Sequence, residues 1–213
     1  TFAKVLQQHG YQTGLIGKWH LGDWTGEGRQ RFHPTNFGFD YFMGLTGGGT
    51  KPVDPELEED GEVSKFSGLT TDILTDRALR FIRQSQATVS PKPFLLCLHT
   101  RAPHAAWLPV APGDWQPYEG LEPIIPNPDY PDLNVAKMKR QLREYLASTS
   151  GVDRNLGRLL RLLDELELTD STVVIFTSDH GYNMGHNGIW HKGNGIWATN
   201  HPLENLHRGV QVI

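Results

Sequence analysis

The sequence predicts an α/β fold in which a mostly parallel central sheet is flanked by helices. Apolar residues at helical spacing alternate along the chain with short, continuous apolar runs, and a polar loop follows each run. Continuous apolar runs are typical of strands that are covered on both faces of a parallel sheet. The order helix, strand, loop occurs three times, which favours an α/β domain over an all-β or an all-helical one.

The first unit is a helix expected over 2–10, with Gly10 at the position that ends it, followed by a strand over 11–17. Residues 18–68 are rich in glycine, proline and aromatic residues and include the acidic stretch 55–62. We expect them to form one long loop, and loops of this length usually have a function.

The second and third units follow the same order. We expect helices over 70–86 and 135–168, strands over 93–100 and 171–179, and a proline-rich loop over 102–132. Thr71 or Asp72 is suited to cap the first of these helices. Gly151 marks either a bend or a close contact between the last helix and the sheet.

Composition excludes several classes of protein. The 213 residues carry a net charge of −4, and no basic stripe of the kind expected in a nucleic-acid-binding protein is present. No apolar run approaches the roughly 20 residues that a membrane-spanning helix needs. Cys97 is the only cysteine, so an intrachain disulfide is impossible.

Three expected strands are each followed by a polar cluster: GKWH (17–20), HTRAPH (99–104) and SDHG (178–181). In open α/β sheets, ligands bind beyond the carboxyl ends of the strands. If the three strands are parallel neighbours, the three clusters meet at one edge of the sheet. We therefore expect the site there.

The pair Asp179–His180 offers a carboxylate oxygen and a ring nitrogen, which suit a divalent cation. The pair alone suits equally well a turn capped by Asp179 with a solvent-facing His180.

The other polar residues are two cations, Lys18 and Lys192, and two histidines, His20 and His104. Each alone is more commonly a solvated or packed side chain than a catalytic one. Together with a cation they suit a tetrahedral oxyanion ester, which needs positive charge on its oxygens and an acid at the leaving oxygen. The sequence contains no GxxxxGK[ST], HExxH or GxSxG motif, which argues against a P-loop enzyme, a zincin and a serine hydrolase.

These segments resemble the type I sulfatases of the alkaline-phosphatase-like superfamily. The motif GYQTGLIGKWHLG (10–22) is similar to the second signature of that family, and HPTNFGFDYFMGL (33–45) is similar to the segment after it. APHAAW (102–107) resembles the family's Pro-His element, and TSDHGYNMGHNGIWHKG (177–193) resembles its metal segment with the lysine that follows. The matches run in the family's order over nearly the whole chain.

The resemblance implies a role for each position. Asp179 and His180 would bind a calcium ion, and Lys18 and Lys192 would bind the sulfate oxygens. His20 would hydrogen-bond the nucleophile, and His104 would protonate the leaving oxygen. Arg101 is a further candidate for contact with a substrate carboxylate or a second sulfate.

One family feature is missing. The nucleophile of the family is a formylglycine made from the cysteine or serine of a C/S-x-P-x-R motif, which this sequence does not contain. Cys97 lies in the middle of an expected strand and is interpreted as a core residue. We therefore expect residues 1–213 to be a partial catalytic domain, inactive alone, that lacks the upstream nucleophile segment and the downstream part.

The function predicted on this basis is a sulfuric ester hydrolase that uses one divalent metal ion and acts on a carbohydrate or aryl sulfate. The family resemblance implies a location outside the cytoplasm. Two alternatives remain open: a phosphonate or phosphate ester hydrolase of the same superfamily, and a non-catalytic, sulfatase-like binding protein.

Overall fold

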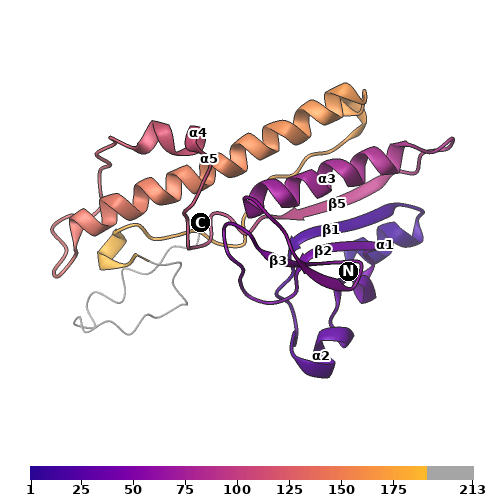
Figure 1. The fold of residues 1–213 in the computed structure, drawn as a ribbon, viewed down its shortest axis with the longest axis horizontal. Helices are drawn as coiled ribbons and strands as arrows, with labels where there is room; N and C mark the ends of the chain where they lie inside the picture. The colour runs from indigo at the N-terminus through magenta and orange to yellow at the C-terminus, as the bar shows by residue number, and fades with distance from the viewer. Residues whose placement is uncertain (191–213) are drawn as a thin grey trace.

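The computed structural model describes residues 1–190, which form a five-stranded sheet with helices on both faces (Figure 1). The strand order is β4-β3-β2-β1-β5, and the strands are β1 (Gln12–Lys18), β2 (Tyr41–Leu45), β3 (Glu56–Glu59), β4 (Glu62–Lys65) and β5 (Phe94–His99). β1 pairs in parallel with both of its neighbours, β2 and β5, whereas β3 and β4 extend the sheet as an antiparallel hairpin. The predicted α/β fold is confirmed.

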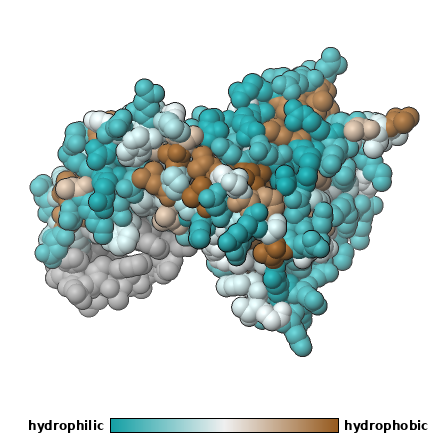
Figure 2. All heavy atoms as spheres, viewed as in Figure 1, coloured by the Kyte–Doolittle hydropathy of each residue, from teal (hydrophilic) through white to brown (hydrophobic). Residues whose placement is uncertain are grey.

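The helices are arranged in layers. The α-helices of the described residues are α1 (Phe2–Gln8), α2 (Gly26–Arg31), α3 (Thr70–Gln86), α4 (Pro112–Trp115) and α5 (Val135–Glu165). α3 packs on the sheet and α5 packs on α3, while α1 lies against the other face (Figure 1). In the same view, hydrophobic residues gather between the sheet and the end of the molecule that carries α4 (Figure 2). No helix within residues 1–190 is long and apolar enough to cross a membrane.

The alternation of side chains along β1 explains why both faces of the sheet are covered. Leu15 points to the α1 side, where it packs with Phe42, and Ile16 points to the α3 side, where it packs with Phe81. Burying each such side chain contributes about 1.5–3 kcal/mol. A Cβ at Gly14 would come within 2.7 Å of the Phe81 ring, so glycine lets α3 lie directly on the strand.

The single loop expected over 18–68 is wrong, because this stretch contains α2, β2, β3 and β4. The acidic residues 55–62 form most of the β3–β4 hairpin, which turns at Asp60 and Gly61 in the left-handed conformation. Two of its carboxylates are paired: Glu58 accepts hydrogen bonds from Arg29 and His33, and Glu59 accepts one from Arg77.

The expected cap of α3 is also wrong. The helix begins after Leu69, which makes no side-chain cap bond. Asp72 instead accepts hydrogen bonds from Arg154 Nη2 at 2.9 Å and from Asn155 Nδ2 at 2.6 Å, both on α5. The side chain that could have capped α3 therefore joins it to α5.

Gly151 marks a close contact rather than a bend, since α5 is one continuous helix. The contact is with α4 and not with the sheet: a Cβ at Gly151 would lie 3.2 Å from Asp114 Oδ2. α4 itself is a short helix inside the stretch 102–132 that we expected to be a proline-rich loop.

The strand expected over 171–179 does not form. Val173, Ile175 and Phe176 are 87%, 81% and 73% exposed, and residues 172–178 pair with no strand among the described residues. A strand needs a neighbour for its backbone hydrogen bonds, which an apolar run cannot supply by itself. In Figure 1 the segment returns from the C-terminal end of α5 toward the loops at the strand ends.

Candidate functional site

The carboxyl ends of β1 and β5 lie side by side, as the sequence predicts for the clusters at 17–20 and 99–104. Gly17 is aligned with His99, and Lys18 is the last residue of β1. A Cβ at Gly17 would lie 1.9 Å from the His99 carbonyl oxygen, and φ at Gly17 is +118°. Only glycine fits there, so this residue sets how closely the two strand ends approach.

The chain beyond β1 is held against the chain beyond β2. The amides of Trp19 and His20 donate to the carbonyl oxygens of Leu45 and Thr46 over 2.9 and 3.1 Å. His20 has φ +50°, a left-handed conformation that turns the chain at this point. Its half-buried ring contacts Trp24, with 4.5 Å between centroids, so the position of His20 is well defined.

His104 lies in the loop that follows β5. Its amide donates to the Arg101 carbonyl oxygen at 2.9 Å, and its ring Nδ1 donates to the Ala105 carbonyl oxygen at 2.7 Å. A carbonyl can only accept, so Nδ1 carries the hydrogen. Nε2 is therefore the nitrogen at which a proton can be taken up or released.

Arg101 is 6% exposed, and its guanidinium bonds to two backbone carbonyls. Nε donates to Thr50 at 2.7 Å, and Nη1 donates to Ala106 at 2.8 Å. Burial lowers the pKa of this guanidinium, and the Tyr182 phenol opposes that effect. Substrate contact by Arg101 stays a prediction. The two hydrogen bonds of its guanidinium connect the segment of Thr50 to that of Ala106.

Asp179 and His180 lie in the extended segment before residue 181. Asp179 is exposed and accepts from the His180 amide through Oδ1 at 3.0 Å, while its Oδ2 lies 3.5 Å from His180 Nε2. Calcium holds its ligands at about 2.3–2.6 Å, so two atoms 3.5 Å apart can both reach one ion. Residues 1–190 contain no group of three or more His, Cys, Asp or Glu side chains that could hold a metal ion. A metal site at Asp179 and His180 stays a prediction.

Tyr182 is a residue that sequence reasoning missed. Its hydroxyl accepts a hydrogen bond from the Ala105 amide at 3.2 Å, and its ring lies edge-on to His104 and Trp107 at centroid distances of 6.3 and 5.8 Å. The segment after Asp179 thus reaches the His104 loop although no strand carries it there. An aromatic residue in a glycine-rich segment gave no signal of this contact. Lys192, also predicted for the site, lies outside the described residues.

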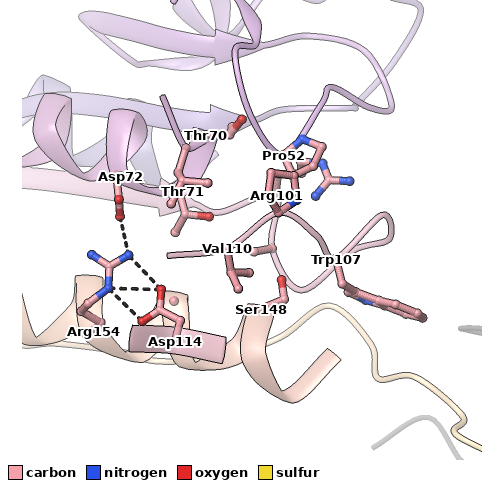
Figure 3. A pocket seen from close by; sticks show the side chains of 14 residues that line it. Pro52, Thr70, Thr71, Asp72, Arg101, Trp107, Val110, Asp114, Ser148 and Arg154 are labelled. Atoms are coloured by element: carbon pink, nitrogen blue, oxygen red, sulfur yellow. Dashed lines mark hydrogen bonds and ion pairs between the residues drawn. The ribbon is translucent and has the colours of Figure 1, made fainter. Parts of the chain in front are cut away.

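A small pocket lies behind these loops, between α3, α5 and the segment after β5 (Figure 3). Arg101 lies on one side of it, and on the other Arg154 is bonded to Asp72 and Asp114. Its volume of about 20 Å³ has room for one water molecule and not for a substrate. We therefore interpret the pocket as a packing gap beneath the loops at the strand ends and not as a substrate site.

A comparison with models of known protein families identifies the family of this chain. The model of the sulfatase family matches residues 1–205. The chain belongs to the sulfatase family. The resemblance seen in the motifs of residues 10–193 is thereby confirmed over nearly the whole sequence.

Several characterised sulfatases are similar to this chain. The N-acetylglucosamine-6-O-sulfatase of Bacteroides thetaiotaomicron is 28% identical over 271 residues, covering 90% of this chain and 46% of that protein. Human iduronate 2-sulfatase is 32% identical over 161 residues, covering 61% and 29%. A solved sulfatase-fold structure in complex with its substrate, D-glucosamine-2-N,6-O-disulfate, superposes with a TM-score of 0.73 at 26% identity, covering 89% of this chain and 51% of that one. This chain spans about half, or less, of the length of these relatives.

Proposed function

We propose that the protein carrying this chain hydrolyses a sulfate ester, and that its substrate is a sulfated saccharide. The observation that carries the proposal is the parallel pairing of β1 with β5, which brings Lys18, His20 and His104 to one edge of a sulfatase sheet. The saccharide is supported by the names of the relatives, which include an N-acetylglucosamine-6-O-sulfatase and a structure bound to a sulfated glucosamine.

In the proposed reaction, a nucleophile forms a bond to sulfur while the bond from sulfur to the substrate oxygen breaks. His104 donates the proton from Nε2 to that leaving oxygen, since Nδ1 is committed to the Ala105 carbonyl. A sugar hydroxyl is a poor leaving group as an alkoxide, so the proton is needed at the moment when the bond breaks.

Lys18 is proposed to bind the non-bridging sulfate oxygens, together with Lys192. The Lys18 backbone is fixed at the end of β1, where its carbonyl accepts from His99 Nδ1 at 3.0 Å. Charge held in a fixed position stabilises developing negative charge without reorganisation during the reaction. His20, placed by the turn after β1, is proposed to hydrogen-bond the nucleophile.

Asp179 and His180 are proposed to contribute two ligands to a calcium ion, and residues 1–190 contain no third His, Cys, Asp or Glu side chain grouped with them. The 3.5 Å separation of Oδ2 from Nε2 supports this assignment. When bound, the ion would supply positive charge next to the sulfate group. The nucleophile is proposed to be the formylglycine that the sulfatase family makes from a C/S-x-P-x-R motif, and none of the 213 residues lies in such a motif.

The test uses the protein as its native host produces it. We expect release of sulfate from glucosamine 6-sulfate and from 4-nitrophenyl sulfate, measured by ion chromatography, and much slower release of phosphate from 4-nitrophenyl phosphate. Lys18→Ala should abolish most of the sulfate release. Lys65→Ala, which removes an exposed lysine from β4, is the matched control and should not change it.

Two results would contradict the proposal, each in favour of one alternative. Faster turnover of the phosphate ester would make the protein a phosphate ester hydrolase. Binding of sulfated saccharide with no release of either anion would make it a non-catalytic binding protein.

A further inference from the structure

The loop that carries His104 is tied to two distant parts of the chain. One tie is Arg101, whose Nε donates to the carbonyl oxygen of Thr50, beyond the end of β2. The other is Tyr182, whose hydroxyl accepts from the amide of Ala105, the residue after His104. Both bonds join the loop to segments that meet only in the folded protein.

The segment 48–50, to which Arg101 is hydrogen-bonded, also lies beside His20. A Cβ at Gly48 would lie 2.9 Å from His20 Nε2, and Thr50, two residues later, is bonded to Arg101. The second bond of the guanidinium, from Nη1 to Ala106 at 2.8 Å, closes back on the His104 loop. Arg101 therefore connects the segment beside His20 to the loop that carries His104.

The partners of the buried Arg101 guanidinium are uncharged. Removing a guanidinium from water costs several kcal/mol, and a carboxylate partner commonly offsets part of that cost. The two bonds of Arg101 go instead to neutral carbonyls on two different loops. A rigid, planar fork of donors is well suited to hold two carbonyls at a fixed separation, and the single ammonium of lysine is not.

Local bonds stiffen the loop as well. Trp107 Nε1 donates to the Pro103 carbonyl oxygen at 2.8 Å, and Thr100 Oγ1 donates to Ala102 at 2.7 Å. These bonds fix the shape of the loop but not its place relative to β1 or to the segment of Asp179. Its placement depends on contacts to other segments, such as those made by Arg101 and Tyr182.

We propose that Arg101 and Tyr182 are positioning residues that hold His104 in register with the sulfate-binding groups. This inference rests on the proposed role of His104 as the acid. Arg101 sets the loop against the segment after β2, and Tyr182 sets it against the segment of Asp179 and His180. This role differs from the substrate contact expected for Arg101 from the sequence.

The first test does not depend on activity. Hydrogen exchange of the native protein is compared with that of Arg101→Lys and Tyr182→Phe, which keep the charge and the ring respectively. We expect faster exchange at 103–107 in both variants, and at 47–50 in Arg101→Lys, with α3 and α5 unchanged. Exchange in these loops equal to that of the wild type would overturn the proposal. Arg77→Lys, at an arginine bonded to Glu59 on β3, is the matched control for loss of a guanidinium.

The second test separates positioning from general destabilisation. If Arg101 acts through His104, then Arg101→Lys should lower kcat for an alkyl sulfate by about 10- to 100-fold and for an aryl sulfate by less than about threefold. In a His104→Ala background, the same substitution should cost the alkyl ester less than about threefold, because residues that act as a unit are not additive. Arg77→Lys should leave the ratio of alkyl to aryl rates unchanged.

The outcomes distinguish this inference from the proposed function. Equal losses on both esters, or full additivity with His104→Ala, would overturn the positioning role while sulfate hydrolysis stands. If the wild-type protein releases no sulfate, the proposed function fails, and the positioning role, which rests on that function, is overturned with it; the hydrogen-exchange comparison then shows only whether Arg101 and Tyr182 hold the loop.

Discussion

His99 Nδ1 donates a hydrogen bond to the backbone carbonyl oxygen of Lys18 across 3.0 Å, joining the carboxyl ends of β5 and β1. The bond lies one residue beyond the point where Gly17 and His99 are aligned in the sheet. A side chain of one strand thus fixes the residue from which the proposed sulfate-binding lysine extends. The sequence placed His99 in the cluster 99–104 expected at this edge, but it predicted no role for His99 itself.

The first prediction follows from this bond. His99→Ala should raise KM for a sulfate ester about three- to tenfold, because a net hydrogen bond is worth about 1 kcal/mol. His99→Asn should retain most of the affinity, since its amide nitrogen can donate from nearly the same place. His9→Ala removes a comparable bond, from Nδ1 to Val5, at the end of α1 and serves as the control. Equal KM values for the Ala and Asn variants would show that the bond does not position Lys18.

The second prediction concerns stability. Arg154 donates to Asp114 from Nε at 2.9 Å and from Nη2 at 3.0 Å, and the Asp114 side chain is 6% exposed. Arg154→Leu should lower the free energy of unfolding by about 3–5 kcal/mol, because it leaves a buried carboxylate uncompensated. Adding Asp114→Asn should recover part of that loss.

Urea unfolding followed by tryptophan fluorescence measures both changes. The control is Arg83→Leu, at a solvent-exposed pair with Glu165 whose charged atoms are 3.6 Å apart. Exposed pairs contribute about 0–1 kcal/mol, so this variant should stay close to the wild type. A loss for Arg154→Leu as small as that of the control would mean that the network does not hold α4 and α5 together.

The third prediction tests whether Cys97 can act as the nucleophile. It lies in the middle of β5, aligned with Leu15 of β1, and burial raises the pKa of its thiol to about 11. The thiolate is therefore scarce at neutral pH, and a thiol reagent should modify the native protein far more slowly than the urea-unfolded one. Cys97→Ala should keep sulfate release within about twofold of the wild type. A folded but inactive variant would assign the nucleophile to Cys97 instead of a formylglycine.

Much of the fold could be predicted because the signals are local. The long helices and the two strands β1 and β5 come from apolar periodicity, which short stretches of sequence contain in full. The expected strand 171–179 was wrong because pairing requires a neighbour, and its apolar residues give no information about whether one is present. The β3–β4 hairpin was missed because charged residues dominate it, and their partners, such as Arg29, lie far away in sequence.

The residues of the candidate site likewise fall into those that the sequence predicts and those that only the packing of the loops reveals. Lys18 ends β1 and His104 follows β5, so the rule that ligands bind at the carboxyl ends of strands predicts both at one edge. Arg101 and Tyr182 act through bonds to backbone groups of other loops, and these bonds depend on how the loops pack. No residue pattern encodes such contacts, so the sequence indicates for Arg101 only a substrate contact, which stays a prediction.

The last prediction separates two roles at the edge of the sheet. If His104 protonates the leaving oxygen, then His104→Ala should reduce kcat/KM strongly for an alkyl sulfate and only weakly for an aryl sulfate, because an activated phenol leaves without a proton. Lys18→Ala removes charge from the sulfate group that both esters share. Its cost should be similar for both, about 2–4 kcal/mol as for other groups that stabilise an oxyanion. Equal losses on both esters for His104→Ala would make His104 a sulfate-binding residue, and the proton would then have to come from another group.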